Sequence, residues 1–346
     1  MAASQSRKRA FWAGSLVVLS AVMAATAFQV SRPPPELAAR NGGALAAPGL
    51  STPAAKPRKI KVVAARGGYT LARTLRDGWV LEERGGYPVS DGAVAGLLAK
   101  AAELRLERAL TRDPAKLDRL RLGDPERGGR GVLLQVQDER GAFLADLVLG
   151  YEPQGVYVRQ RGAVQAWFTR GRLPDLSTPA MWIARPDVLA SEQFVRLDVQ
   201  PRVGPGYSLV RNAAGQTVMG PPFQVRRILD RVAAQSIWQT VQTFAPVDVA
   251  GAAAAAGPLL GRVLATTADG LVLRIELRAL EAGSWLMISA AAGEEPSPEA
   301  QARAGAINQA FGPWAFRLTP AATEAVLPAL AALTEPPAPE SVPGPP

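Results

Sequence analysis

The feature that most constrains the fold of this chain is a hexapeptide that occurs twice. "GYTLAR" spans residues 68–73 and "GYSLVR" spans residues 206–211. Each copy follows an alternating apolar run, "KIKVV" from Lys59 and "FVRLDV" from Phe194, and such alternation is typical of half-buried strands. A repeated unit with the same surroundings predicts two structurally similar domains.

The segments that follow the two copies also correspond. After the first copy, Ser90 or Asp91 is placed to cap a helix whose apolar residues recur at helical spacing: Val94, Leu97, Leu98, Ala101 and Leu104. After the second copy, Pro221-Pro222 are placed to begin a helix. Its predicted apolar face consists of Val225, Ile228, Leu229 and Val232.

Hairpin patterns complete both units. In the first, apolar runs flank the turn at 138–141, and two more strand patterns begin at Gly155 and Ala163. In the second, Asp269-Gly270 separates two alternating runs, and Asp-Gly in that position is a strong hairpin signal. "QAWF" from Gln165 is matched by "PWAFRL" from Pro313, with a helix-like insertion over residues 298–310 before it.

These patterns predict an α+β fold: a tandem duplicated unit of antiparallel β-sheet packed on helices, preceded by a single N-terminal transmembrane helix. The predicted segments are a cytoplasmic stub and anchor (1–28), a Pro/Ala-rich tether (29–59), a first α+β repeat (60–200), a second repeat (201–335) and a disordered Pro-rich tail (336–346).

The anchor is predicted from an uncharged run of residues 10–28 behind Arg7-Lys8-Arg9. As a helix the run would span about 28 Å, close to the thickness of a bilayer core. The basic cluster predicts a cytoplasmic N-terminus and an extracytoplasmic remainder. Cleavage after Ala27 is an alternative, because Ala25-Thr26-Ala27 is a small-x-small triplet, but signal-peptide cores are usually shorter. A buried helix of a soluble domain fits poorly with the Pro-rich segment that follows.

The net charge of +9 lies entirely in the N-terminal segment. Ten basic residues and one acidic residue precede Gly67, and the rest of the chain has 29 of each. Nucleic-acid-binding proteins carry their basic excess on the folded module. The distribution therefore argues against a nucleic-acid partner. Four basic residues lie at the end of the tether: Lys56, Arg58, Lys59 and Lys61. We interpret them as a solvated charge run, and the alternative is contact with anionic headgroups.

The chain contains no histidine and no cysteine. This excludes disulfides, thiolate or imidazole metal sites and a histidine general base. Candidate acids such as Glu82-Glu83 and Asp138-Glu139 fall at strand ends or turns, and Lys100 and Lys116 are the only lysines after Arg66. We therefore predict no catalytic, cofactor-binding or metal-binding residues and no cofactor.

Other motifs favour structural roles. "RGGRG" at 127–131 is typical of a loop rather than an RNA-binding segment, and "GAAAAAG" at 251–257 lacks the Lys and Ser/Thr of a phosphate loop. Four tryptophans within strand patterns are predicted to pack in the core rather than stack on a ligand: Trp79, Trp167, Trp285 and Trp314.

Several segments resemble a bacterial family, the domain of unknown function 4340. They are "GWVLEE" from Gly78, "VAGLLAKAAELRLER" from Val94, "LRLGDP" at 120–125, "LVLG" from Leu147 and "GVYVRQRGAVQAWF" from Gly155. The resemblance covers residues 67–199 well and 205–333 more loosely. It implies a membrane-anchored protein associated with ABC transport systems of the gliding-motility type, and it implies no active-site residues. The long tether and the Pro-rich tail depart from the family pattern.

We therefore expect a non-enzymatic protein of the bacterial inner membrane, single-pass and N-in, with the bulk of the chain in the periplasm. Its expected partners are the membrane, through residues 10–28, and membrane or periplasmic proteins such as ABC transporter subunits. The alternative is an extracytoplasmic hydrolase or small-ligand-binding protein that uses carboxylates in a cleft between the repeats.

Overall fold

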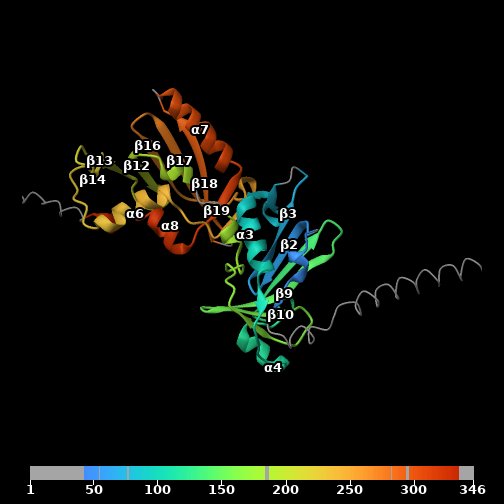
Figure 1. The fold of residues 1–346 in the computed structure, drawn as a ribbon. Helices are drawn as coiled ribbons and strands as arrows, with labels where there is room; N and C mark the ends of the chain where they lie inside the picture. Colours follow the sequence, from blue (N-terminus) through green and yellow to red (C-terminus); the bar gives the residue numbers. More distant parts are fainter. Residues whose placement is uncertain are drawn as a thin grey trace, which may run out of the picture.

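The molecule is built on two large antiparallel sheets, one in each of two lobes (Figure 1). The computed structural model describes residues 43–334, apart from 54, 76–77, 184–186, 282 and 294–295. Helices lie beside both sheets, so the fold is mixed α+β with antiparallel sheets, as the sequence predicts.

The first sheet has nine strands in the order β5-β4-β3-β2-β8-β9-β10-β11-β7. A separate pair joins β1 to β6. The bounds of these strands are β1 (Ala44–Leu45), β2 (Pro57–Ala64), β3 (Gly67–Arg73), β4 (Trp79–Leu81), β5 (Tyr87–Val89), β6 (Arg105–Leu106), β7 (Arg108–Ala109), β8 (Val132–Asp138), β9 (Phe143–Glu152), β10 (Gly155–Gln160) and β11 (Trp167–Thr169).

The second sheet has eight strands in the order β14-β13-β12-β16-β17-β18-β19-β15. Their bounds are β12 (Phe194–Pro201), β13 (Tyr207–Arg211), β14 (Thr217–Met219), β15 (Asp248–Gly251), β16 (Leu259–Thr267), β17 (Leu271–Leu280), β18 (Gly283–Ala292) and β19 (Trp314–Arg317).

The helices are short and most have a polar cap. Their bounds are α3 (Asp91–Ala102), α4 (Pro114–Leu117), α5 (Asp187–Ala190), α6 (Arg231–Gln242), α7 (Pro298–Phe311), α8 (Pro320–Val326) and α9 (Leu330–Leu333). Short 3-10 turns include η2 (Pro48–Ser51), η3 (Glu82–Arg84) and η6 (Pro179–Trp182). Helix α3 begins where the sequence predicts, because the Ser90 side chain accepts a hydrogen bond from the Ala93 amide.

The two sheets have the same strand order. Read from one edge, β4-β3-β2-β8-β9-β10-β11-β7 corresponds strand by strand to β14-β13-β12-β16-β17-β18-β19-β15. In each lobe a helix, α3 or α6, follows the third strand of the unit, and the chain then reaches the far edge of the sheet. Strand β5 is found only in the first lobe, and α7 is inserted before the last strand of the second.

The repeated Gly-Tyr pair occupies the same place in both sheets. Tyr69 lies opposite Val62 and Tyr207 lies opposite Val199, each in the first hairpin of its sheet. A Cβ on Gly68 would lie 2.7 Å from the Val62 carbonyl oxygen, and one on Gly206 would lie 3.2 Å from that of Val199. The close approach of the paired strand explains why glycine precedes each tyrosine.

Two segment boundaries differ from those expected. Strand β12 forms its hydrogen bonds with β13 and β16, so the sheets divide between β11 and β12 and not at residue 200. The part of the expected tether from Gly43 onward belongs to the first lobe. Ala46 and Ala47 are buried because their small side chains fit against the core, and the Ala46 amide donates to the Leu104 carbonyl.

The second predicted helix begins later than expected. Helix α6 starts at Arg231 and buries Ala234, Ile237, Trp238 and Val241, whereas Val225, Leu229 and Val232 are exposed. In a longer helix, the amides of Leu229 and Asp230 would donate to carbonyls four residues before them. Here both donate to the Leu333 carbonyl, at 2.8 and 3.4 Å. This tertiary contact prevents the helix from extending toward Pro222.

The expected anchor (residues 10–28), most of the tether and the tail (336–346) lie outside the described residues. Among the residues that are described, no helix is both long enough and apolar enough to cross a bilayer.

A three-residue ion network stabilises the second sheet. Glu276 on β17 accepts hydrogen bonds from Arg262 on β16 (3.0 Å) and from Arg278 (3.0 Å). Burial alone would raise the pKa of Glu276, but the hydrogen bonds from Arg278 and Arg262 outweigh it and lower the pKa. A depressed folded-state pKa adds stability above the unfolded-state pKa, and that stability is lost as the pH falls through the folded-state value.

We predict that Glu276→Gln lowers the free energy of unfolding by about 2 kcal/mol at neutral pH, because two arginines lose their charged partner. The difference from wild type should shrink as the pH falls below about 4. Thermal unfolding followed by circular dichroism across this pH range measures both effects. Glu281→Gln, at an exposed position on the same hairpin, is the control and should be neutral. Equal melting temperatures for wild type and Glu276→Gln at neutral pH would contradict the prediction.

Candidate functional site

The two lobes meet through aromatic side chains. Tyr87 on β5 contacts Trp314 on β19 edge-on, with ring centroids 5.0 Å apart, and lies 6.3 Å from Phe316. Tyr87 and Phe316 are buried, so this contact joins the hydrophobic interiors of the lobes into one cluster. The strand present only in the first lobe thus supplies an apolar contact with the second.

Beside the aromatic contact, an ion pair also links the lobes. Arg84 in η3 forms a bidentate ion pair with Asp248 on β15. Its Nε donates to Oδ1 at 2.7 Å and its Nη2 donates to Oδ2 at 3.2 Å. The second-lobe residue Arg317 approaches the same carboxylate, with Nη2 3.7 Å from Oδ2. The Asp248 side chain is 13% exposed, and its Oδ1 also accepts from the Val249 amide.

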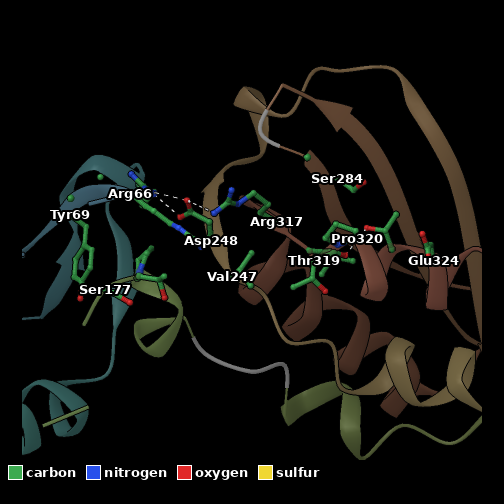
Figure 2. Close-up of a pocket in the computed structure, with 18 residues that line it drawn as sticks. Arg66, Tyr69, Ser177, Val247, Asp248, Ser284, Arg317, Thr319, Pro320 and Glu324 are labelled. Carbon is green, nitrogen blue, oxygen red and sulfur yellow. Dashed lines mark hydrogen bonds and ion pairs between the residues drawn. The ribbon is translucent and has the colours of Figure 1, made fainter. Parts of the chain in front are cut away.

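A cavity of about 690 Å³ opens next to this ion pair, between the lobes (Figure 2). The first lobe contributes Arg66 from the turn after β2, the first residues of β3 (Gly67 to Tyr69), Arg84 and the start of η6. The second lobe contributes β15, the start of β18, the end of β19 and the first residues of α8. The charged side chains of its lining are Arg66, Arg84, Arg317, Asp248 and Glu324.

The first-lobe wall is fixed by buried phenols. Tyr69 Oη donates to the Leu176 carbonyl (3.1 Å) and accepts from Trp182 Nε1 (3.0 Å). Tyr151 Oη accepts from the Leu176 amide (3.1 Å). Burial raises the pKa of Tyr69 and of Tyr151 far above neutrality, so both phenols remain protonated and act as structural hydrogen-bonding groups.

The second lobe has a counterpart to this arrangement. Tyr207 Oη donates to the Pro328 carbonyl (2.8 Å), and burial raises its pKa as well. The segments after the last strands also share a sequence, Thr178-Pro179-Ala180 and Thr319-Pro320-Ala321. The Thr-Pro pairs of both segments line the cavity, which therefore lies where equivalent parts of the two lobes face each other.

The arrangement is suited to recognising charge, because three arginines and two acids line the cavity. The oxygens of Asp248 accept hydrogen bonds from Arg84 and from the Val249 amide. Elsewhere in the second lobe, burial would raise the pKa of Asp198, but hydrogen bonds from Arg196 and Ser208 outweigh it and lower the pKa. Within the described part of the chain, no group of three or more acidic residues is placed to hold a metal ion.

Most candidates from the sequence lie away from this cavity. Lys116 pairs with Asp113 at 3.5 Å, and Lys100 is in the last turn of α3. Glu83 accepts from the Thr70 amide and hydroxyl, and Asp138 accepts from the Arg140 and Ala142 amides of its turn. Three of the four tryptophans, Trp79, Trp167 and Trp285, are buried as predicted. Trp314 is half-buried at the contact between the lobes.

Sequence reasoning missed the residues that build the site. Arg84 and Asp248 are 164 residues apart, so no local pattern connects them. The repeated Thr-Pro-Ala tripeptide is the one signal that could have indicated the cavity, because each copy follows the last strand of its repeat.

Comparison with known proteins gives one match. A family model described as a domain of unknown function (DUF4340) matches residues 79–258, which is more than half of the chain. The chain belongs to this family. The DUF4340 match extends from β4 to β15 and therefore includes both members of the Arg84–Asp248 pair. No curated protein and no solved structure matches the chain.

We predict that Arg84→Ala loosens the lobe contact, because Asp248 loses its bidentate partner while it remains largely buried. The chain lacks cysteine, so spin labels at Arg140→Cys in the first lobe and Val203→Cys in the second report the distance between lobes. The distance distribution should broaden in Arg84→Ala. A double-mutant cycle of Arg84→Ala with Asp248→Asn, measured as free energies of unfolding, should give a coupling energy of about 1–3 kcal/mol.

The control is Lys116→Ala, which removes an exposed ion pair within the first lobe. It should leave the distribution unchanged. An unchanged distribution in Arg84→Ala would show that the aromatic contact alone fixes the lobes.

Proposed function

We propose that this protein is a non-enzymatic, membrane-anchored protein of the bacterial periplasm and an accessory or scaffold component of an ABC-type transport or envelope complex. Residues 10–28 would form an uncleaved anchor with the N-terminus in the cytoplasm. The folded lobes would then work at the outer face of the inner membrane, held by a tether. We also propose that the lobes are copies of one duplicated unit, which their common strand order supports.

The observation that carries the non-enzymatic proposal is the state of Asp248. Of the two acids that line the cavity, Asp248 is enclosed whereas Glu324 is exposed, and Asp248 is engaged by Arg84 from the other lobe. A general acid or base must be within hydrogen-bonding reach of its substrate. A carboxylate that accepts a bidentate arginine and a backbone amide instead holds two lobes in one orientation.

The scaffold proposal is supported by the way the chain is assembled. Two lobes behind an apolar N-terminal segment would search the membrane face while remaining attached to it. Such tethering raises the effective concentration of the lobes toward partners in the same membrane. Membership of the DUF4340 family is compatible with this role, and the proposed transporter association comes from the resemblance described above.

The proposal is tested by crosslinking the full chain in its native membrane and identifying the captured proteins by mass spectrometry. We expect one or a few integral or periplasmic proteins, ABC transporter subunits among them, in amounts comparable to the chain itself. Replacing residues 10–28 with a cleavable export signal is the control. It should release the chain from the membrane and reduce capture of the integral partners.

Capture of the same proteins without the anchor would argue against membrane tethering as the basis of the interaction. Absence of any reproducible protein partner would contradict the scaffold role.

A second candidate is binding of a small ligand in the cavity between the lobes. The specific observation in its favour is the cavity itself, which brings three arginines, two acids and several hydroxyl groups together. Arg66 is exposed at its rim, and arginine is well suited to bind carboxylate or phosphate groups. The ligand class that fits is therefore a small molecule with an anionic group.

Native mass spectrometry of protein purified from its native source tests this second candidate. If the cavity binds such a ligand, an additional mass should remain on the wild-type chain and disappear in Arg66→Glu. Lys56→Glu makes the same charge change outside the cavity and should keep the ligand. A mass retained equally by all three proteins would place any ligand elsewhere.

A further inference from the structure

Beyond the cavity, the second lobe has an exposed surface of unusual composition at its outer end. Val225 is 91% exposed, Val232 is 81% exposed and Leu229 is 52% exposed. Arg226, Arg227 and Arg231 lie among them in the sequence and line a groove of about 540 Å³ beside β14. We call these six residues the arginine–valine patch.

The backbone of this patch is fixed by tertiary contacts. Ile228 forms a bridge with Thr334, and the amides of Leu229 and Asp230 donate to the Leu333 carbonyl. Asp230 is the only acid between residues 220 and 235, and its side chain caps α6 by accepting from the Ala233 amide. The aliphatic side chains are thus held in solvent by an ordered segment, and the local charge is positive.

The position of the patch in the fold supports a docking role. It occupies the segment between the third strand of the unit and the helix, which in the first lobe is the segment from η3 to β5. That first-lobe segment docks on the other lobe through Arg84 and Tyr87. In the second lobe the corresponding segment does not meet the first lobe, because it lies at the end of the molecule away from the described part of that lobe (Figure 1).

The chemistry of the patch differs from that of the first-lobe contact. Protein interfaces are rich in aromatic residues as well as in arginine. Here the exposed apolar groups are aliphatic instead, and the one aromatic ring nearby, Phe223, is half-buried under Arg226 at 4.9 Å. Aliphatic side chains that enter a headgroup region, flanked by arginines, are typical of contact with an anionic membrane surface.

A second copy of this chain fits the patch less well. The strand of the first lobe that corresponds to β15, the docking strand of the second lobe, is β7. Strand β7 carries Arg108, and Arg105 and Arg112 lie on either side of it in the sequence. The neighbouring acid, Glu107, is paired with Arg170 at 3.2 Å. Like charges would oppose such a contact.

We propose that the arginine–valine patch docks on an anionic lipid surface, with Val225, Leu229 and Val232 entering the headgroup region and the three arginines contacting phosphate groups. The inference rests on the proposed membrane attachment only in that the anchor would keep the patch near a bilayer. Docking would place the outer end of the second lobe on the membrane.

The test uses the absence of cysteine. Val225→Cys and Val232→Cys are labelled in the full chain with an environment-sensitive fluorophore, and each protein is reconstituted into vesicles of phosphatidylcholine with or without phosphatidylglycerol. We expect a blue-shifted emission with phosphatidylglycerol at both positions, which high salt reverses. Val203→Cys, also 81% exposed and in the same lobe, is the matched control and should not shift.

Replacing the arginines tests the charge contribution. Each of Arg226→Gln, Arg227→Gln and Arg231→Gln should lower the ratio of docked to undocked protein about fivefold. No shift with phosphatidylglycerol, or an equal shift with phosphatidylcholine alone, would overturn the proposal. A shift that requires an added acidic membrane protein would overturn it in favour of a protein partner, and chain dimers on the vesicles would do so in favour of a second copy.

Flotation of the same vesicles separates this proposal from the anchor proposal. A chain that does not float with phosphatidylcholine vesicles lacks a membrane-inserted anchor, whereas the label still reports whether the patch binds phosphatidylglycerol. Circular dichroism of each variant verifies folding, and the exposed positions chosen should leave it unchanged.

Discussion

The architecture of each lobe depends on one long-range strand pairing. Strand β2 pairs with β8 in the first lobe and β12 pairs with β16 in the second, and each pairing joins a first hairpin to a later meander across an intervening helix. The meanders form from local contacts, whereas this central pairing must close a long loop. Without it the first hairpin, which carries the Gly-Tyr pair and in the first lobe also part of the cavity wall, would have no sheet to join.

The lobe contact combines an apolar and a charged interaction with different roles. The Tyr87–Trp314 contact removes apolar surface from water, which stabilises the joined state. The Arg84–Asp248 pair loses solvation when it is enclosed, so its net contribution to stability is small. Its planar, bidentate geometry instead restricts how the lobes can be rotated against each other. The aromatic contact favours association, and the ion pair selects one orientation.

Sequence reasoning recovered the elements that are specified locally. The hairpin at Asp269-Gly270, the Ser90 cap of α3 and the inserted helix α7 follow from turn chemistry, capping and periodicity. The start of α6 did not follow from these, because the carbonyl of Leu333, about a hundred residues later, binds the amides that decide it. The cavity could not be predicted from the sequence for the same reason. Arg84 and Asp248 meet only after both sheets have formed, and single-sequence patterns contain no information on that pairing.

The distribution of charge explains how the second lobe can have a cationic surface although its charges nearly balance. Residues 194–334 contain eleven arginines and ten acidic residues, but several of the acids are engaged within the fold. Glu276 binds Arg262 and Arg278, and Glu192 and Asp269 bind Arg303. The three arginines of the arginine–valine patch form no ion pair with another described residue. Near-equal numbers of basic and acidic residues in the second lobe still permit a local positive excess, because some of the acids are engaged elsewhere in structural ion pairs.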